Sequence, residues 1–351
     1  GIPSQLLSPE ETSEHWPWLD YDSVQGAFYV PSNGQVNPLD VCLALARGAR
    51  QKGAQIFEDT LAARILTRDG PVIGVKTDKG VIATEKVLLS GGMWTSRFAK
   101  AHGVTVPLHA AEHFYIVTEP VDALPKTLPV LNIAEERTYW KEDAGKLLFG
   151  FAHFHAKAWA KDGIPESFEF DSLPFVEDDV MEVLELAMNR VPILQETGIR
   201  TFFNGPESYS HDGRFTLGEA PNLKGYFVLA GANSTGIQSG PGAGKAVADW
   251  IMQGHPPMDL SEMDPARIED FQARDSYLRE RCPETLVLTY AMHWPGRQRE
   301  TVRNLRRTPL FHAMKQQGAV YAEVQGWERP GWFAPEGVER SFDYSFHRPN
   351  W

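Results

Sequence analysis

Apolar and polar positions in the first hundred residues switch between the spacing of strands and the spacing of helices. Asn37-Pro38 predicts the start of a helix, because proline fits a first turn, and apolar residues at helical spacing continue it to Gly53. A second helix is predicted over Trp94–His102. Short runs around them predict strands at Gly26–Val30, Ala54–Glu58, Val72–Thr77, Val81–Ala83 and Lys86–Ser90, the last buried on both faces. This alternation is typical of a layered α/β domain.

The pattern changes between about residues 109 and 205. Strands rich in aromatic and β-branched residues are predicted at His113–Thr118, Thr138–Lys141 and Lys146–Phe151, followed by one amphipathic helix at Asp178–Arg190. Because these strands and this helix are segregated along the chain, they indicate an α+β module inserted into the first domain. The α/β pattern returns with a buried strand at Tyr226–Ala230.

The last hundred residues show weaker periodicity. Asp264-Pro265 predicts the start of a helix. The basic stretch Arg297–Arg307 alternates with apolar residues, which favours a solvated helix face over a nucleic-acid surface. Trp327–Trp351 is dense in proline, glycine and aromatic residues, and we expect it to be a connector packed on another part of the protein.

Composition and charge exclude several classes of protein. The chain has 351 residues, of which 42% are hydrophobic and 23% charged, the balance of an ordinary globular protein. Its net charge of −12 argues against nucleic acid as a partner, and no apolar run is long enough to cross a membrane. Two cysteines cannot form a disulfide framework, so a reducing compartment is expected. The first residues do not form a signal peptide.

The sharpest local feature is Tyr226–Ile251, where the buried strand leads into a glycine-rich loop and then a helix, predicted to start at about Gly242. Free backbone N–H groups and the positive end of the helix dipole favour an anion, or a ring that becomes anionic. The loop is neither a Walker A loop nor a dinucleotide fingerprint, because Ala246 and Lys245 stand where each pattern needs another residue. A tight turn that only packs on the sheet is the alternative.

Several motifs, in this order and spacing, carry a resemblance that runs over nearly the whole chain. They are Asn37-Pro38, LLSGGMW (Leu88–Trp94), EHFYIVTEPV (Glu112–Val121), FFNGPESYSHDGRF (Phe202–Phe215), AGANSTGIQSGPGAGKA (Ala230–Ala246) and SFHRPNW (Ser345–Trp351). The chain resembles the D-amino-acid-oxidase-like flavoproteins and, within them, the dimethylglycine dehydrogenase and sarcosine dehydrogenase family.

The resemblance implies an FAD-binding domain of the glutathione-reductase type, which here lacks its N-terminal βαβ unit, with an inserted antiparallel-sheet substrate domain. The expected boundaries are 1–108 and 206–256 for the incomplete FAD-binding domain, 109–205 for the substrate domain, and 257–351 for a central domain and connector. Family members continue into a folate-binding domain similar to the glycine-cleavage T-protein. We therefore expect the chain to be an internal fragment of a longer polypeptide.

The resemblance also implies roles for individual residues. His113 matches the family's active-site histidine, and Tyr139 matches a tyrosine near the substrate. The residues expected to bind substrate are Tyr115, Trp140, Phe151 and Arg214, with Arg137 and Lys141 as alternatives for the substrate carboxylate. The residues expected to contact FAD are Leu61 through its backbone, Gly91, Gly92, Trp94, Gly231, Asn233, Gly236, Ile237, Gln238 and Gly240.

Other chemistry receives little support from the sequence. His153-x-His155 resembles a metal-binding pair, but no third ligand stands at a useful spacing, so no metal site is expected. Glu135-Glu136 and Asp178-Asp179 are expected in solvated turns and helix starts rather than as catalytic pairs. Ser234 lacks the context of a nucleophilic serine.

The implied activity is FAD-dependent oxidative demethylation of a small N-methylated amino acid, dimethylglycine first and sarcosine second. The iminium product would give formaldehyde or pass its carbon to tetrahydrofolate in the expected folate domain, and electrons would leave to an electron-transfer flavoprotein or to oxygen. A non-catalytic module that completes a flavoprotein is the alternative of another class. The expected location is the bacterial cytoplasm, with the mitochondrial matrix as the alternative.

Overall fold

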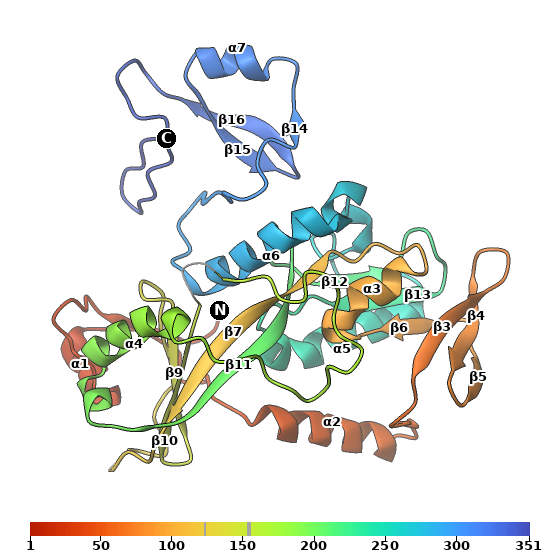
Figure 1. The fold of residues 1–351 in the computed structure, drawn as a ribbon, viewed down its shortest axis with the longest axis horizontal. Helices are drawn as coiled ribbons and strands as arrows, with labels where there is room; N and C mark the ends of the chain where they lie inside the picture. The colour runs from red at the N-terminus through yellow and green to blue at the C-terminus, as the bar shows by residue number, and fades with distance from the viewer. Residues whose placement is uncertain (123, 153–155) are drawn as a thin grey trace.

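The computed structural model describes residues 1–122, 124–152 and 156–351 and has mixed α/β content (Figure 1). Its largest sheet is antiparallel and has the strand order β11-β7-β10-β9-β8. These strands are β7 (Leu108–Thr118), β8 (Leu131–Ile133), β9 (Thr138–Asp143), β10 (Lys146–Phe151) and β11 (Ile199–Ser210). The three strands predicted in this region are confirmed.

One face of this sheet is covered by helix α4 (Asp178–Arg190), which has the predicted bounds. Val180, Val183 and Ala187 of the helix pack in one buried cluster with Trp140 and Phe149 of the sheet. Because side chains of a strand alternate between the two faces of a sheet, every second residue of these strands points to the opposite face, away from α4. A short helix, η2 (Pro192–Gln195), follows α4 and leads the chain into β11.

A smaller sheet contains the predicted buried strand that leads into the glycine-rich loop and the following helix. Its order is β12-β13-β6, with β12 (Thr216–Glu219), β13 (Tyr226–Ala230) and β6 (Val87–Leu89), and β13 runs parallel to β6. The predicted strand Tyr226–Ala230 is confirmed. The predicted burial of the Lys86–Ser90 run on both faces is wrong: β6 is an edge strand among the described residues, and Leu88 is 40% exposed.

The N-terminal part of the chain contains small elements around these two sheets. They are β1 (Gln5–Leu7), α1 (Pro9–His15), β2 (Ala27–Tyr29), α2 (Pro38–Gln51), β3 (Ala62–Thr67), β4 (Val72–Thr77), β5 (Gly80–Ala83), η1 (Gly92–Trp94) and α3 (Thr95–Lys100). The side chain of Asn37 caps α2, and β4 and β5 form the predicted hairpin. The predicted strand at Ala54–Glu58 is wrong, because no described strand pairs with this exposed stretch and a strand needs a ladder.

The C-terminal part begins after α5 (Gly236–Gln253), which packs on the small sheet through Val247 and Trp250. Its elements are η3 (Pro265–Arg267), η4 (Asp270–Ala273), α6 (Asp275–Tyr290), β14 (Arg306–Arg307), α7 (Phe311–Gln316), β15 (Ala319–Val324) and β16 (Trp327–Phe333). Figure 1 shows α7 and the β14-β16-β15 sheet standing beyond α6.

Two predictions for this part need correction. The stretch Arg297–Arg307 is not a helix face, since it runs as irregular chain up to β14 and its arginines bond to buried partners. Trp327–Trp351 is not all connector, because it opens with β16. Helix α6 had no sequence signal, because it contains Pro283 and its apolar residues do not form a single stripe along it. In the described part of the chain no helix is long and apolar enough to cross a membrane.

Candidate active site

The face of the large sheet that is free of α4 carries a cavity of about 320 Å³, here called the aromatic cavity. The strand register assembles it: Gly150 of β10 lies opposite both Tyr115 and Tyr139, and Gly205 of β11 lies opposite His113. The lining residues are Met93, His113, Tyr115, Tyr139, Phe168, Asp171, Phe203, Gly205, Pro206 and Glu207. Three residues predicted from the resemblance, His113, Tyr139 and Tyr115, therefore lie together.

The rings around the aromatic cavity are fixed by one another. Tyr139 stacks on Tyr290 at the end of α6, with ring centroids 5.4 Å apart, and Tyr115 stacks on Phe203 at 4.8 Å. The ring of His113 is 5.1 Å from that of Tyr290. Gly150 makes room for this arrangement, because a β-carbon there would lie 2.1 Å from the ring of Tyr139. Aromatic rings attract a cation that lies over a ring face, so a cavity lined by such rings suits a cationic ligand.

The imidazole of His113 is held by a carboxylate. Its Nδ1 lies 2.6 Å from Oε2 of Glu207, two residues beyond Gly205 on the same face of β11. With Nδ1 donating to Glu207, the neutral ring leaves Nε2 as the acceptor. That Nε2 is buried and has no hydrogen-bond partner among the described residues. The pair therefore holds a free basic nitrogen beside the cavity.

Glu207 is also tied to the glycine-rich bend, which we define as Ala230–Gly240. The hydroxyl of Ser234 in this bend donates to Glu207 at 2.6 Å, and Tyr209 donates to Glu207 at 2.8 Å. Burial raises the pKa of the Glu207 carboxyl, but the hydrogen bonds from His113, Ser234 and Tyr209 outweigh it, so the net pKa lies below its usual value. Glu207 is therefore ionised at neutral pH.

The bend lines a second cavity, of about 430 Å³, here called the bend cavity. Its lining includes Gly92, Glu207, Gly231, Asn233, Ser234, Gly236, Ile237 and Gly240. Glu207 alone among the described residues lines both this cavity and the aromatic cavity. The two cavities thus meet at one ionised carboxylate.

The backbone of the bend is shaped to receive a ligand. Helix α5 begins at Gly236, six residues before the predicted start, and no side chain caps its first N–H groups. Asn233 and Ser234 both have left-handed φ values, 47° and 65°, a strained arrangement that persists where the surrounding structure enforces it. A β-carbon at Gly240 would meet nothing within 4 Å, so open space lies beside the first turn of the helix.

The other residues predicted to contact FAD differ in their exposure and in whether they line the bend cavity. Gly92 lines the bend cavity and its neighbour Met93 lines the aromatic cavity, so this turn touches both. Trp94 is 46% exposed. The side chain of Asn233 is used internally, since its Oδ1 accepts from the N–H of Ser210 at 2.8 Å. The remaining predicted contacts of this group are Gly91, which precedes η1, and the exposed Gln238 in the first turn of α5.

The backbone groups of Leu61, predicted to contact FAD, are hydrogen-bonded to Asp78. The N–H of Leu61 donates to the carboxylate of Asp78 at 3.0 Å, and its carbonyl accepts from the N–H of Asp78 at 3.1 Å. The N–H of Leu61 is therefore already used, and its carbonyl, which can accept a second hydrogen bond, and its exposed side chain are what it offers a ligand.

Three residues predicted to bind substrate also lie elsewhere. Trp140 and Phe151 are fully buried in the core under α4, because alternation along β9 and β10 turns them away from Tyr139 and Gly150. Arg214 is ion-paired with Glu262 and lines a third cavity that shares no residue with the other two. We withdraw these three from the proposed substrate pocket.

A side chain that binds the carboxylate of a substrate is better sought on the face of the sheet that carries Tyr139. Lys141 follows Tyr139 by two residues on β9 and shares its face, with its Nζ 3.8 Å from Asp143. Arg137 precedes Tyr139 by two residues and has a φ of 56°. His153 and His155 lie outside the described residues, and the rest of the chain holds no group of three side chains suited to a metal.

Glu207, Tyr209 and Tyr290 are the site residues that sequence reasoning missed, and Ser234 was considered only as a nucleophile. The available signal was the period-two spacing of Gly205, Glu207 and Tyr209, which places them on one face of a strand. Nothing local shows that this face meets His113, because their pairing joins residues 94 positions apart.

Sequence comparison shows the family to which the chain belongs. A family model described as FAD dependent oxidoreductase matches residues 1–250, and a second, described as FAD dependent oxidoreductase central domain, matches residues 253–308. The chain belongs to the FAD-dependent oxidoreductase family. This flavoprotein has the fold of the solved L-proline dehydrogenase of P. horikoshii, with a TM-score of 0.67 and 24% identity over 76% of this chain and 69% of that one.

Individual relatives of the flavoprotein match its whole length. It is 38% identical over 100% of the chain to 4-methylaminobutanoate oxidase (formaldehyde-forming) of Paenarthrobacter nicotinovorans, covering 42% of that protein. Mouse pyruvate dehydrogenase phosphatase regulatory subunit (35%) and mouse sarcosine dehydrogenase (34%) follow, over 100% and 99% of the chain and 40% and 38% of those proteins. Human dimethylglycine dehydrogenase is 29% identical over 99% of the chain, covering 41% of that protein. The chain thus spans about two fifths of the length of these relatives.

The residues of the bend fit the family's cofactor. The free N–H groups at the start of α5 and the positive end of its dipole suit the electron-rich edge of a flavin, and the glycines leave its approach open. Ser234 and Glu207 then lie between this edge and the aromatic cavity. FAD bound there would supply the acceptor for a hydride from a substrate in the aromatic cavity.

Proposed function

We propose that the complete protein oxidises a small N-methylated amino acid at its N-methyl carbon, with FAD as the electron acceptor. The observation that carries the proposal is the position of Glu207, which lines both cavities and holds His113. The names of the relatives at 38%, 34% and 29% identity support the same class of substrate.

The residues of the aromatic cavity suit the proton transfer that this reaction needs. Hydride loss from an N-methyl carbon requires a neutral amine, whereas the free amino acid carries an ammonium group. His113 accepts that proton at Nε2, and the ionised Glu207 on Nδ1 stabilises the positive imidazole that results. The rings of Tyr115 and Tyr139, which line the cavity, then lie beside the cationic iminium product and stabilise it.

Hydrolysis of the iminium releases formaldehyde and the demethylated amine. Transfer of the carbon to tetrahydrofolate, and delivery of electrons to an electron-transfer flavoprotein or to oxygen, remain predictions for the complete polypeptide. The greater identity to the 4-methylaminobutanoate oxidase and the sarcosine dehydrogenase supports testing 4-methylaminobutanoate and sarcosine as substrates beside dimethylglycine. The three amines therefore form the test panel.

The test uses the full-length protein. We expect a yellow protein whose flavin absorbance bleaches without oxygen on addition of at least one of the three amines, with one formaldehyde formed for each flavin reduced. N-methylated amines without a carboxylate serve as controls. A coloured protein that none of the amines bleaches contradicts the proposal and favours a non-catalytic role, a class represented by the pyruvate dehydrogenase phosphatase regulatory subunit.

A further inference from the structure

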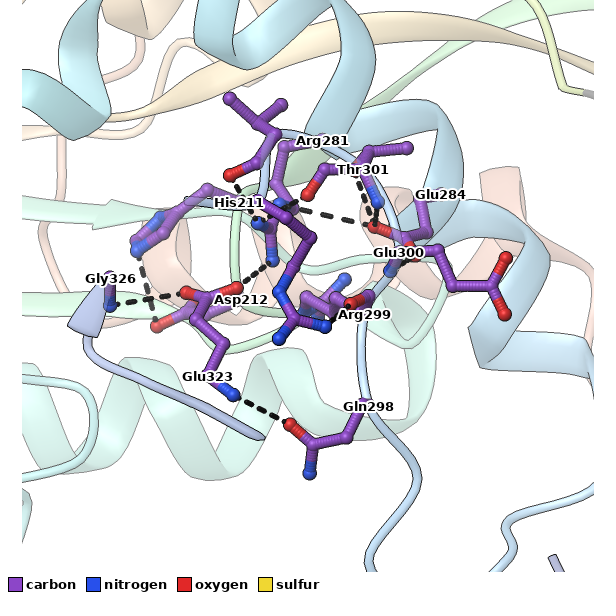
Figure 2. Close-up of polar contacts among 12 residues, drawn as sticks. His211, Asp212, Arg281, Glu284, Gln298, Arg299, Glu300, Thr301, Glu323 and Gly326 are labelled. Atoms are coloured by element: carbon purple, nitrogen blue, oxygen red, sulfur yellow. Dashed lines mark hydrogen bonds and ion pairs between the residues drawn. The ribbon is translucent and has the colours of Figure 1, made fainter. Parts of the chain in front are cut away.

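A third cavity, of about 540 Å³, shares no lining residue with the aromatic cavity or the bend cavity. It lies where the segment after β11 meets α6, the irregular chain that follows α6, and β15 (Figure 2). Five of its lining residues are arginines, and we call it the arginine cavity: Arg214, Arg267, Arg281, Arg297 and Arg299. It is thus formed by both segments that match the family models.

The acidic residues of the lining do not balance these arginines. Three carboxylates line the cavity, and each is matched with one arginine: Asp212 with Arg267 at 3.0 Å, Glu323 with Arg281 at 2.7 Å, and Glu262 with Arg214. Among the lining side chains alone, five positive and three negative charges leave +2, while Glu284, outside the lining, lies 3.9 Å from Nε of Arg281. Within the described chain, Arg297 and Arg299 have no carboxylate at ion-pair distance.

Arg299 is the more constrained of these two guanidinium groups. Its Nη1 donates to the hydroxyl of Thr285 at 2.8 Å, a neutral partner on α6. Burial, and then the nearby charge of Arg281, lower the pKa of Arg299, which shows that its surroundings oppose the positive charge. An anion beside it would remove that opposition, because an opposite charge offsets the desolvation of a buried cation.

His211 adds a second and independent sign of a ligand. Its side chain is only 6% exposed and lines the cavity, yet its Nδ1 has no hydrogen-bond partner among the described residues. Buried polar atoms without partners are rare in folded proteins. Burial lowers the pKa of His211 to about 4, so the ring is neutral at pH 7 and Nδ1 can carry a hydrogen to donate.

We propose that the arginine cavity binds the oxyanion group of a small molecule, a carboxylate or a phosphate, between His211 and the two unmatched arginines, Arg297 and Arg299. Guanidinium forks match the planar or tetrahedral oxygens of such groups, and charge-assisted hydrogen bonds are the strong ones. The cavity volume accommodates a small metabolite rather than a bare ion. This site is separate from the one at which the amine is proposed to react.

The experiment titrates the full-length protein with inorganic phosphate and, separately, with malonate, at constant ionic strength set with chloride. We expect a saturable rise in melting temperature and heat of binding with at least one of the two anions. A response to phosphate alone assigns a phosphorylated ligand, and a response to malonate assigns a carboxylate. No saturable response to either overturns the proposal, including the case in which an acidic side chain elsewhere in the polypeptide already fills the site.

A charge-matched pair of variants locates the site. Arg299→Gln should weaken the responding anion about ten- to a hundredfold, the usual range for one charge-assisted hydrogen bond. Arg329→Gln, at an exposed arginine of β16, removes the same charge and should leave the affinity unchanged. If Arg299→Gln does not fold, Arg297→Gln provides the same test at the other unmatched arginine. Equal affinity in the wild type and the cavity variant overturns the assignment.

Discussion

The aromatic cavity and the glycine-rich bend meet at Glu207, yet they are built in opposite ways. The bend is one continuous stretch whose binding groups are backbone amides, and its shape depends on glycines and on two left-handed residues. The aromatic cavity is made of residues from five separate segments, and the register of β7, β9, β10 and β11 holds most of them in place. A site made of backbone groups is therefore encoded by one local stretch of sequence, whereas a site made of side chains from several strands depends on how those strands pair.

This contrast also separates the expected effects of mutation. Changes in the aromatic cavity should alter the rate and the substrate affinity while FAD remains bound. Changes in the bend should alter FAD retention and stability first. The four predictions below test that division in the full-length protein.

The largest effect is expected from His113→Phe, which keeps an aromatic ring but removes Nε2. The rate of flavin reduction by substrate should fall about 10²- to 10⁴-fold, the usual contribution of an acid–base group. Stopped-flow absorbance without oxygen measures it. His312→Phe, at an exposed histidine of α7, is the control and should leave the rate unchanged. An unchanged rate in His113→Phe across pH removes this residue from the mechanism.

Glu207→Gln should lower the same rate about ten- to a hundredfold, since a neutral amide stabilises the positive imidazole less. Because the folded protein lowers the pKa of Glu207, this carboxylate stabilises the fold above its ordinary pKa of 4.5 and loses that contribution as pH falls through the lowered value. The variant should therefore show a shallower decline of melting temperature below pH 4.5. Glu85→Gln, at an exposed position, should retain the wild-type profile; an identical profile in Glu207→Gln would contradict the assigned network.

Gly150→Ala tests whether the sheet itself shapes the substrate pocket. The added methyl group would lie 2.1 Å from the ring of Tyr139, so this ring must move and substrate affinity should fall about tenfold. FAD content should stay at the wild-type level. The dissociation constant for substrate and the flavin-to-protein absorbance ratio are the measurements. Gly48→Ala, where a β-carbon meets nothing within 4 Å, should change neither. Loss of FAD with unchanged affinity would reverse the proposed division of roles.

Gly231→Ala is the corresponding change in the bend. Gly231 has a φ of 73°, and a β-carbon there would lie 3.1 Å from Leu108 and 3.3 Å from the carbonyl of Arg214. The free energy of unfolding should fall by about 1–3 kcal/mol, and FAD should be retained less well. Gly254→Ala shares the left-handed backbone, with a φ of 79°, but meets nothing within 4 Å. It should lose stability without losing FAD, and equal FAD loss in both would count against a specific role of the bend.

The sequence predicted best those elements whose signal is local. Strand β13 and helix α4 appear with the predicted bounds, because each has a complete apolar pattern. The start of α5 was placed six residues too late, since Gly236 and Gly240 lie among its first five residues and glycine is a poor helix former. Helix α6 was missed because Pro283 argues against a helix and its apolar residues form no amphipathic stripe.

The candidate site was predicted in part for the same reason. His113, Tyr139 and Tyr115 were found through the resemblance, and the bend through its glycines. Trp140 and Phe151 were assigned to the pocket because a strand sequence does not tell which of its two faces meets a ligand. The pairing of His113 with Glu207 depends on the register of β11 on β7, which no local pattern specifies.

The central claim is that the amides at the start of α5 face the flavin while His113 faces the amine, with Glu207 between them. A crystal structure of the complete protein with FAD and an unreactive N-methylated amino acid analogue tests it most directly. We expect the electron-rich edge of the flavin within hydrogen-bond distance of the Gly236–Gly240 backbone, and the nitrogen of the analogue within reach of Nε2 of His113. A flavin bound away from the bend, or an analogue outside the aromatic cavity, would contradict the account.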